Sequence, residues 1–453
     1  DHIEGLRSFI SEYSPEQVAS VVGISAQSIA ALGDDIGAAK SAAFYMSTGV
    51  NMGRQGSLAY WLLFMLSVVT GNLDKPGGNV YSRGFYPAAK SGRIQGDVKY
   101  EPTPLGDVRK IRGSLPGNLM ADMILSEDNP IKGLIVISGN PILSMGSGEK
   151  LQRALEQLEF VIVIDIYPSA TSEYADYLLP ATDMFERADI NICGLGMQKE
   201  PFIQYTNFIV PPKAERRPEW WILRQIELAQ GFATENRELD DYQGAIDELG
   251  LFSRFDHMLR QSNLSINDVK SSGTVVLDSV APGKFFSNVI QTESSRVDCM
   301  PSSFDEAIGR CREIFNELGR EPRNQLKMIS RRTNYMINSW FHNVPSLKRP
   351  KHQNNPLYVH PDDARARNLG EGSSVTVKNE FGEIRTVVAL DESLKTGTVA
   401  ITHGWGYTGK NMQTAAKFAG SNANNLLPTG PGSFEKISNQ SFMTGIKVDV
   451  EAV

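Results

Sequence analysis

The sequence predicts a mixed α/β protein in which doubly wound parallel α/β domains are followed by a β-rich, barrel-like domain. A strand–helix–strand pattern between residues 133 and 166 indicates the parallel sheet, and a series of short strands after Asn355 indicates the barrel. The length of 453 residues exceeds the size at which one hydrophobic core usually gives way to several domains. We therefore expect at least three structural units.

The composition excludes several classes of protein. The chain has 45 Lys+Arg, 52 Asp+Glu and a formal net charge of -7, so it lacks the basic field that attracts nucleic acid. The longest apolar run, residues 58–69, is shorter than the roughly 20 residues that cross a bilayer, and we expect no transmembrane segment. Cys193, Cys299 and Cys311 form no CxxC pair, which excludes a disulfide framework or a tetrathiolate metal site built from this chain.

The first hundred or so residues begin with helical sequence. Ser14 has the form of the N-cap of a capping box, and Gly23 ends the helix that follows. Residues 42–49 (AAFYMSTG) are predicted to form a buried strand that ends in a polar loop. The apolar residues 58–69 form the next helix, and we expect a domain boundary near the middle of the Gly-, Pro- and charge-rich residues 81–117.

The clearest supersecondary unit follows this boundary. Residues 133–138 and 160–166 are predicted to be buried strands, and residues 149–158 place leucines at helical spacing between them. Such a βαβ unit has parallel strands and a right-handed crossover. A ligand is therefore expected in the crevice at the C-terminal ends of these strands.

Gly139, Asn140 and Asp165 follow the two strands at this edge. Gly139 permits close backbone approach, and the Asn140 amide both donates and accepts hydrogen bonds. Asp165 stands where a dinucleotide fold binds a ribose hydroxyl, and a carboxylate can equally take two donors from a guanine edge. The structural alternatives are an ordinary strand-to-helix turn at Gly139–Asn140 and a turn-opening Asp at position 165.

The second half of the chain changes in character. Residues 190–321 give a mixed pattern with one clear helix around residues 220–229. After Asn355, short strands separated by Gly-containing turns are predicted at residues 375–379, 383–390, 398–402 and 446–452.

Residues 330–343 (SRRTNYMINSWFHN) are unusually dense in hydrogen-bond donors. Arg331 and Arg332 open this segment, and arginine pairs bidentately with phosphate, so the segment suits a polyanionic ligand with a heteroaromatic ring. The alternative is a solvated loop. His403, in the sequence HGWG, is either a general acid or a structural histidine. No two of the six histidines have the spacing of a metal site.

Taken in order, several segments resemble the dimethyl-sulfoxide-reductase family of molybdenum and tungsten enzymes. The resemblance runs through nearly the whole chain and rests on residues 47–78, 137–141, 163–189, 330–343, 360–382, 403–406 and 424–430. It implies a bis-molybdopterin guanine dinucleotide cofactor, in which two dinucleotides hold one Mo or W atom. It also implies that the barrel is six-stranded, double-psi-like and closed over the pterins.

The resemblance divides the chain into four parts. Residues 1–105 would be the C-terminal part of a dinucleotide-binding α/β domain, and residues 106–190 a second α/β cofactor-binding domain. Residues 191–325 would be a mixed connecting region. Residues 326–453 would be the β-barrel domain that binds the molybdopterin dinucleotide.

The resemblance also assigns cofactor-binding positions. Gly49, Val50 and Met52 would lie along one dinucleotide, with Met52 standing where relatives often have Gln. Gly139 and Asn140 would contact a dinucleotide through their loop, Asp165 would recognise guanosine, and Arg187 replaces the Lys of some relatives. The residues expected to line pterin and phosphate are Arg331, Arg332, Asn338, Ser339, Trp340, His342 and Asn343, with His403 and Asn425 near them.

The family's metal-ligating residue and its N-terminal iron–sulfur cysteines lie upstream of the region that corresponds to Asp1. The sequence therefore assigns no catalytic or metal-ligating residue, and an iron–sulfur cluster remains possible in an N-terminal part. The first residues (DHIEGLRSFI) lack an initiator Met and a signal peptide, which is typical of a start internal to a longer protein. This chain alone is expected to hold no metal and to be inactive.

The implied full-length enzyme oxidises or reduces a small substrate by two electrons, through formate-type dehydrogenation or oxygen-atom transfer involving an oxyanion or an S- or N-oxide. Hydration without net redox is a third option. An electron-transfer subunit is a possible partner, and the bacterial cytoplasm is the expected compartment. Two alternatives are a non-catalytic scaffold subunit that has lost its cofactor and an ordinary nucleotide-binding α/β enzyme, which the β-rich domain and HGWG disfavour.

Overall fold

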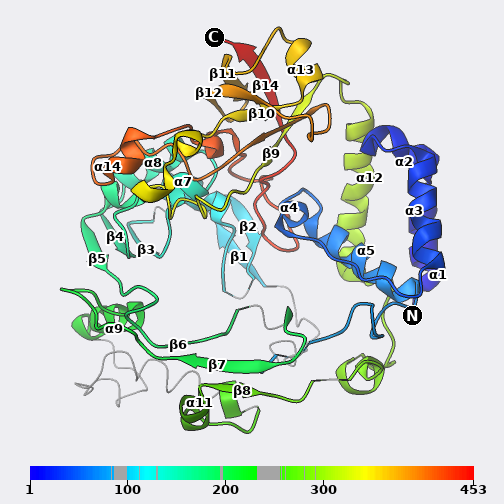
Figure 1. Cartoon of the computed structure of the whole chain (residues 1–453), viewed down its shortest axis with the longest axis horizontal. Coiled ribbons are helices and arrows are strands. Elements are labelled where there is room, and N and C mark those ends of the chain that lie inside the picture. Colours follow the sequence, from blue (N-terminus) through cyan, green and yellow to red (C-terminus); the bar gives the residue numbers. More distant parts are fainter. Residues whose placement is uncertain are drawn as a thin grey trace.

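The computed structural model describes residues 1–453 except 83, 86–98, 112, 129–130, 194–196, 232–255, 257, 261, 280 and 291. In Figure 1 the C-terminal barrel lies at the top, a small parallel sheet at the left and a layer of helices at the right. Antiparallel strands from the middle of the chain lie along the bottom. The predicted domain boundary falls partly on residues 86–98, which lie outside the described residues.

The helical layer joins the first residues of the chain to residues around 305–319. Its core contains Leu6, Trp61 and Ile308, and the Trp61 ring stacks on Phe304 with ring centroids 5.1 Å apart. Among the described residues, no helix combines the length and apolar character that a membrane crossing requires. The helices are α1 (Ile3–Ser11), α2 (Pro15–Val22), α3 (Ala26–Ala38), α5 (Gly56–Val69) and α12 (Asp305–Gly319).

The capping box predicted at α2 is confirmed. The Gln17 backbone N–H donates to Ser14 Oγ at 3.4 Å, and the Ser14 N–H donates to Gln17 Oε1 at 2.9 Å. Gly23 ends the helix with a φ of 64°, a left-handed conformation that glycine adopts without steric cost.

The strand predicted at residues 42–49 is wrong. Residues 42–47 pair with no strand in the part of the chain that the structure describes, and the following residues form the short helix α4 (Thr48–Asn51). Side chains replace the partner strand, because the Ala42 N–H donates to Asn72 Oδ1 and the Asn79 amide pairs with both backbone groups of Phe44. The segment is also not buried, since Tyr45 is 76% exposed.

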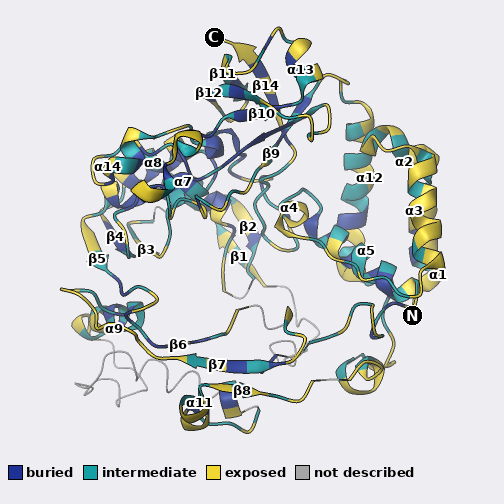
Figure 2. Ribbon diagram, in the orientation of Figure 1, coloured by how far each residue is buried: buried dark blue, intermediate teal, exposed yellow. Residues whose placement is uncertain are grey.

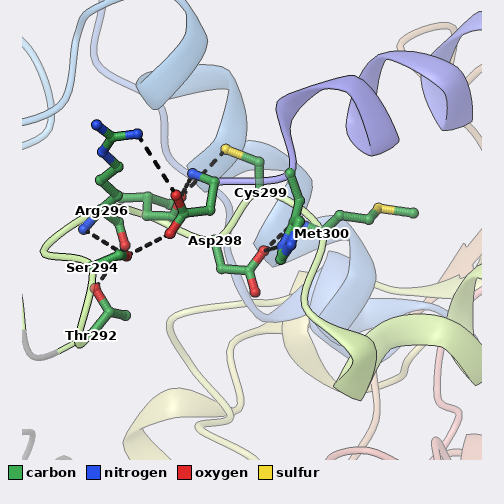
Figure 3. A network of polar contacts seen from close by, with 9 residues as sticks. Thr292, Ser294, Arg296, Asp298, Cys299 and Met300 are labelled. Atoms are coloured by element: carbon green, nitrogen blue, oxygen red, sulfur yellow. Dashed lines mark hydrogen bonds and ion pairs between the residues drawn. The ribbon is translucent and has the colours of Figure 1, made fainter.

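The first residues pack against residues 292–300 (Figure 3). The Cys299 N–H donates to the Asp1 carbonyl oxygen at 3.0 Å, and Ser294 Oγ donates to the Asp1 carboxylate at 2.5 Å. His2 Nδ1 lies 2.8 Å from Asp298 Oδ1. These contacts tie α1 to the segment that leads into α12.

The βαβ prediction is confirmed. Strands β3 (Gly133–Ile137), β4 (Phe160–Asp165) and β5 (Tyr177–Pro180) form a parallel sheet in that order. Helix α8 (Gly148–Glu156) covers one face, where Val161 and Val163 are buried with Leu151 and Leu155. Helix α9 (Glu219–Ala229) covers the other, where Ile164 packs with Ile222. The sheet therefore carries helices on both faces. Two short helices complete this unit, α6 (Met120–Ile124) and α7 (Pro141–Ser144).

The middle of the chain forms smaller antiparallel units. Strands β1 (Tyr100–Thr103) and β2 (Gly106–Arg109) form a hairpin. A second sheet has the order β6–β7–β8, and helix α11 packs beside it over the buried residues Ile203 and Val269. The bounds of these elements are β6 (Asp189–Ile190), β7 (Phe202–Thr206), α11 (Ile266–Ser272) and β8 (Thr274–Val276).

The C-terminal strands form a closed six-stranded barrel in the order β10–β12–β11–β14–β9–β13, so the predicted barrel is confirmed. Two pairs are parallel, β9 with β13 and β10 with β12, and the others are antiparallel. Alternate residues of each strand point inward, as Val375 and Val377 do, which gives the dark buried strands of Figure 2. The strands are β9 (Leu326–Ser330), β10 (Leu357–Val359), β11 (Ser374–Asn379), β12 (Gly382–Leu390), β13 (Thr398–Ile401) and β14 (Ile446–Ala452).

Segments that leave the barrel pack onto the parallel sheet. Tyr407, Met412 and Ala415 lie in the same core as the α8 leucines. Ala415 belongs to the short helix α14 (Gln413–Lys417), and a further short helix, α13 (Pro361–Arg365), follows β10. The Asn424 amide donates to the Leu143 carbonyl oxygen at 2.6 Å. The ends of the sheet and the barrel loops are therefore held together, which brings their polar side chains close.

Candidate functional site

A cavity of about 380 Å³ lies where α4, the end of β9 and the loop after β13 meet. Residues far apart in the sequence supply its walls, and several of them belong to the predicted cofactor-binding set. Its lining includes Ser47, Thr48, Gly49, Met52, Ser144, Ser330, Arg332, Asn338, His403 and Asn424.

Glycine at position 404 allows the two barrel loops to approach each other. Gly404 has a φ of 86°, and a Cβ there would lie 2.1 Å from the carbonyl oxygen of Asn338. Asn338 itself has a φ of 55°. Only glycine fits this contact, so Gly404 of HGWG allows His403 to lie against the donor-rich loop.

His403 makes polar contacts through both ring nitrogens. Its Nδ1 lies 2.8 Å from Ser330 Oγ, and its Nε2 lies 2.9 Å from Asn338 Oδ1 and 3.1 Å from Arg332 Nη1. Arg332 Nη1 also donates to Asn338 Oδ1. The Ser330 hydroxyl donates or accepts equally well, so it complements either tautomer of the imidazole.

Burial, and then the Arg332 cation, lower the pKa of His403 from 6.5 to about 4. At neutral pH the ring is therefore uncharged and both accepts and donates one hydrogen bond. Arg332 keeps its charge. Arg332 thus offers a cation to a ligand in the cavity, His403 a neutral imidazole and Asn338 an amide. These groups suit phosphate oxygens and the polar edge of a heteroaromatic ring.

Asn140 connects this cavity region to the parallel sheet. Its Nδ2 donates to Ser339 Oγ at 3.0 Å, and its Oδ1 accepts from the backbone N–H and the hydroxyl of Thr171 at 3.2 and 3.0 Å. Two predicted residues, Asn140 and Ser339, are therefore in direct contact although 199 positions separate them.

A second polar group lies at the C-terminal ends of β3 and β4. Asp165 ends β4, and Glu219, the first residue of α9, pairs with Arg187 at 2.8 Å. The Ser138 hydroxyl donates to Glu219 at 3.4 Å. This is the strand edge where the sequence places a ligand. Glu219 connects the group, since it pairs with Arg187 and its charge, after burial, helps to raise the pKa of Asp165.

Several predicted residues lie outside the cavity lining. The Arg331 guanidinium pairs with Asp391 at 2.5 Å and lies 4.1 Å from the Tyr358 ring centroid. His342 is fully buried, with its Nε2 3.1 Å from the Phe418 carbonyl oxygen, and burial lowers its pKa to about 4. Asn343 Oδ1 accepts the Thr414 and Ala415 N–H groups at 3.0 and 3.2 Å, within the first turn of α14.

The remaining predicted residues have varied surroundings. Val50 and Trp340 are 48% and 42% exposed, so both are accessible. Gly139 lies in the loop after β3. Asn425 has a buried Oδ1 without a hydrogen-bond partner in the described part of the chain.

The predicted site residues did not include several polar residues of these two sites, among them Ser47, Thr48 and Ser144 of the cavity lining. Ser330, Asn424 and Ser138 lie inside segments that the sequence singled out, although no role was assigned to their side chains. Ser330 ends β9 and Ser138 follows β3, and this position at a strand end was the available signal. Glu219 gave no such signal, because 81 positions separate it from Ser138.

Comparisons with known proteins show which protein families the chain resembles. Residues 8–228 match the family model described as "Molybdopterin oxidoreductase", and residues 326–439 match "Molydopterin dinucleotide binding domain". The chain is 28% identical to a nitrate reductase of Synechocystis over 51% of this chain and 34% of that protein. It is 24% identical to a trimethylamine-N-oxide reductase of Haemophilus influenzae over 86% of this chain and 52% of that protein.

Among solved structures, the acetylene hydratase of Pelobacter acetylenicus superposes on 100% of this chain and 66% of its own, with a TM-score of 0.75 and 16% identity. At that identity the likeness concerns the fold alone. The chain spans about a third to about half of the length of the two relatives above. Both family models describe molybdopterin proteins, in agreement with the cofactor that the resemblance implies.

Proposed function

Given that this chain belongs to the dimethyl-sulfoxide-reductase family of molybdopterin oxidoreductases, we propose that it forms the cofactor-binding C-terminal part of a two-electron oxidoreductase. One observation carries the proposal: Gly49 and Met52 near α4 share a cavity with Arg332, Asn338 and His403 of the barrel domain. The cofactor is bis-molybdopterin guanine dinucleotide with Mo or W.

The side chains present fit such a group. The cavity of about 380 Å³ lies at the lower end of the roughly 300–1,000 Å³ range of small-molecule sites, so it accommodates one part of a cofactor that consists of two dinucleotides. Arg332 supplies a permanent cation for phosphate, and the neutral His403 and the Asn338 amide supply donors and acceptors for a pterin edge. The buried Asn425 Oδ1, which lacks a partner among the described residues, is a further acceptor.

In this proposal each of the two polar groups binds a different part of the cofactor. The cavity residues hold the pterin and phosphates, Asp165 and Arg187 hold a guanosine, and Asn140 with Ser339 lies between the two. When bound, the cofactor supplies the two-electron redox chemistry, while the chain orients it, compensates its charge and excludes water.

We propose the reduction of a small oxyanion or S- or N-oxide, or formate-type dehydrogenation, as the reaction, with an electron-transfer subunit as partner. Hydration without net redox is the third option. The donor set of the cavity argues against a scaffold that has lost its cofactor, since a scaffold needs no cation and amides facing an open cavity.

Elemental analysis of the full-length protein from its native host tests the proposal. Mo or W is measured by mass spectrometry, and GMP is measured after acid release. The proposal expects both in the same preparation. Absence of metal and of GMP would instead identify a scaffold.

A further inference from the structure

The polar group at the ends of β3 and β4 includes Glu219, the first residue of α9. Glu219 uses both carboxylate oxygens within the protein: Oε1 accepts from Ser138 Oγ at 3.4 Å, and Oε2 accepts from Arg187 Nη1 at 2.8 Å. Its side chain is 21% exposed. Glu219 is therefore already engaged and is poorly placed to bind a ligand itself.

Asp165 has the opposite character. Its Oδ1 accepts the Ile166 and Tyr167 N–H groups at 2.7 and 3.4 Å, whereas Oδ2 has no partner in the part of the chain that the structure describes. Burial, opposed by these bonds and aided by the nearby Glu219 charge, raises the pKa of Asp165. A half-buried carboxylate with a free oxygen gains most from a ligand that brings two N–H donors.

The Arg187 guanidinium uses only one of its nitrogens in contacts with the described residues. Its Nη1 is paired with Glu219, and its remaining N–H groups have no partner among the described residues. Because Glu219 already compensates its charge, this guanidinium is better suited to the neutral edge of a base than to a phosphate. Arginine binds the O6 and N7 acceptors of guanine in a bidentate way.

We propose that Glu219 is a positioning residue: it fixes Arg187 so that Arg187 reads O6 and N7 of a guanine while Asp165 reads the N1–H and the 2-amino group. This inference rests on the proposed function, since it concerns how that cofactor's nucleotide is recognised. Adenine is rejected at both contacts, because its 6-amino donor faces a guanidinium and its N1 acceptor faces a carboxylate.

Nucleotide analogues test the Arg187 and Asp165 contacts with guanine separately. The 453-residue chain is titrated with GDP, with 7-deaza-GDP, which lacks the N7 acceptor, and with IDP, which lacks the 2-amino group. Dissociation constants from ligand-observed NMR are compared for the wild type and Glu219→Gln. Glu227→Gln is the matched control, because Glu227 lies in the same helix and pairs with Arg224 instead. Circular dichroism checks that each variant is folded.

For the wild type we expect each analogue to bind about fivefold more weakly than GDP, as the loss of one half of a bidentate contact implies. In Glu219→Gln the 7-deaza-GDP penalty falls to about twofold or less while the IDP penalty stays. Glu227→Gln keeps both penalties. An unchanged 7-deaza-GDP penalty in Glu219→Gln, or an equal loss of both penalties, overturns the inference. Failure of the wild type to bind GDP at millimolar concentration counts against the proposed function as well.

Discussion

The imidazole of His403 lies against a permanent cation, since its Nε2 is 3.1 Å from Nη1 of Arg332. Protonation of the ring would place two positive charges side by side in a partly buried cavity. The arrangement therefore keeps His403 neutral and leaves Arg332 as the charged donor. Asn338 Oδ1 contacts both residues and completes the cluster.

The first prediction concerns the pKa of His403, which burial and then Arg332 hold at about 4. NMR titration of the imidazole resonances measures it directly. Arg332→Ala should raise the pKa only in part, because burial is the larger cause. A wild-type value near the ordinary 6.5 contradicts the geometry of the cluster.

The second prediction concerns stability against pH. His342 and His403 both have pKa values lowered from 6.5 to about 4, so the unfolded chain binds more protons than the folded chain between these limits. The contribution of these two histidines to the free energy of unfolding is therefore fully present above about pH 6.5 and is lost as the pH drops toward 4. His403→Gln should reduce the slope in this window by about one proton, as measured by urea unfolding at several pH values. Equal slopes in the two proteins would argue against a depressed pKa at His403.

The third prediction separates two adjacent arginines. Arg331 pairs with Asp391 and packs over Tyr358, so Arg331→Ala should destabilise the cofactor-free chain by about 1 kcal/mol. Arg332→Ala should cost less than about 0.5 kcal/mol, because Arg332 pairs with no carboxylate among the described residues and contacts only the Asn338 amide and the neutral His403 ring. Denaturant midpoints are measured for both variants. A larger loss of stability in Arg332→Ala than in Arg331→Ala would contradict the structural role given to Arg331.

The fourth prediction concerns Gly404, where a Cβ would lie 2.1 Å from the Asn338 carbonyl oxygen and φ is 86°. Gly404→Ala should destabilise the chain by about 2–3 kcal/mol through strain and the steric clash. Gly370→Ala is the control, since a Cβ at Gly370 meets nothing within 4 Å. Calorimetric unfolding measures the loss of stability in both variants. Similar losses would contradict the close approach of Gly404 to the Asn338 carbonyl group.

The fifth prediction concerns Asn140. Asn140→Ala removes the acceptor for both the N–H and the hydroxyl of the buried Thr171, and should cost about 2–3 kcal/mol. Asn140→Asp should cost less than about 1 kcal/mol, because it keeps this acceptor and the Ser339 hydroxyl can donate to it instead. Chemical unfolding measures both variants. Equal costs would mean that the Thr171 contacts contribute little.

The elements that the sequence predicted well are those with local periodicity. Val161 and Val163 alternate with Ile162 and Ile164 along one strand, and the barrel strands show the same alternation. Residues 42–49 have the composition of a strand but lack one, because the amides of Asn72 and Asn79 take the partner's place. A pattern within a segment carries no information about such a distant partner.

The candidate site was predictable in its segments but not in its side-chain directions. Arg331 and Arg332 are neighbours in the sequence, yet one lies against Asp391 and the other in the cavity. Their direction depends on the barrel closing, which brings His403 beside β9. Glu219 was missed for the same reason, since only the packing of α9 onto the sheet brings it to Ser138 and Arg187.

The central claim is that the cavity between α4 and the barrel holds the cofactor. The most direct test is the GMP and metal content per chain of the full-length protein carrying Arg332→Ala and Asn338→Ala, compared with the wild type and with Arg365→Ala, a surface variant of the same domain. We predict that the double variant loses about nine-tenths or more of both GMP and Mo or W, as the loss of a charge-assisted contact and an amide implies, while Arg365→Ala retains them. Unchanged GMP and metal content in a folded double variant would contradict the claim.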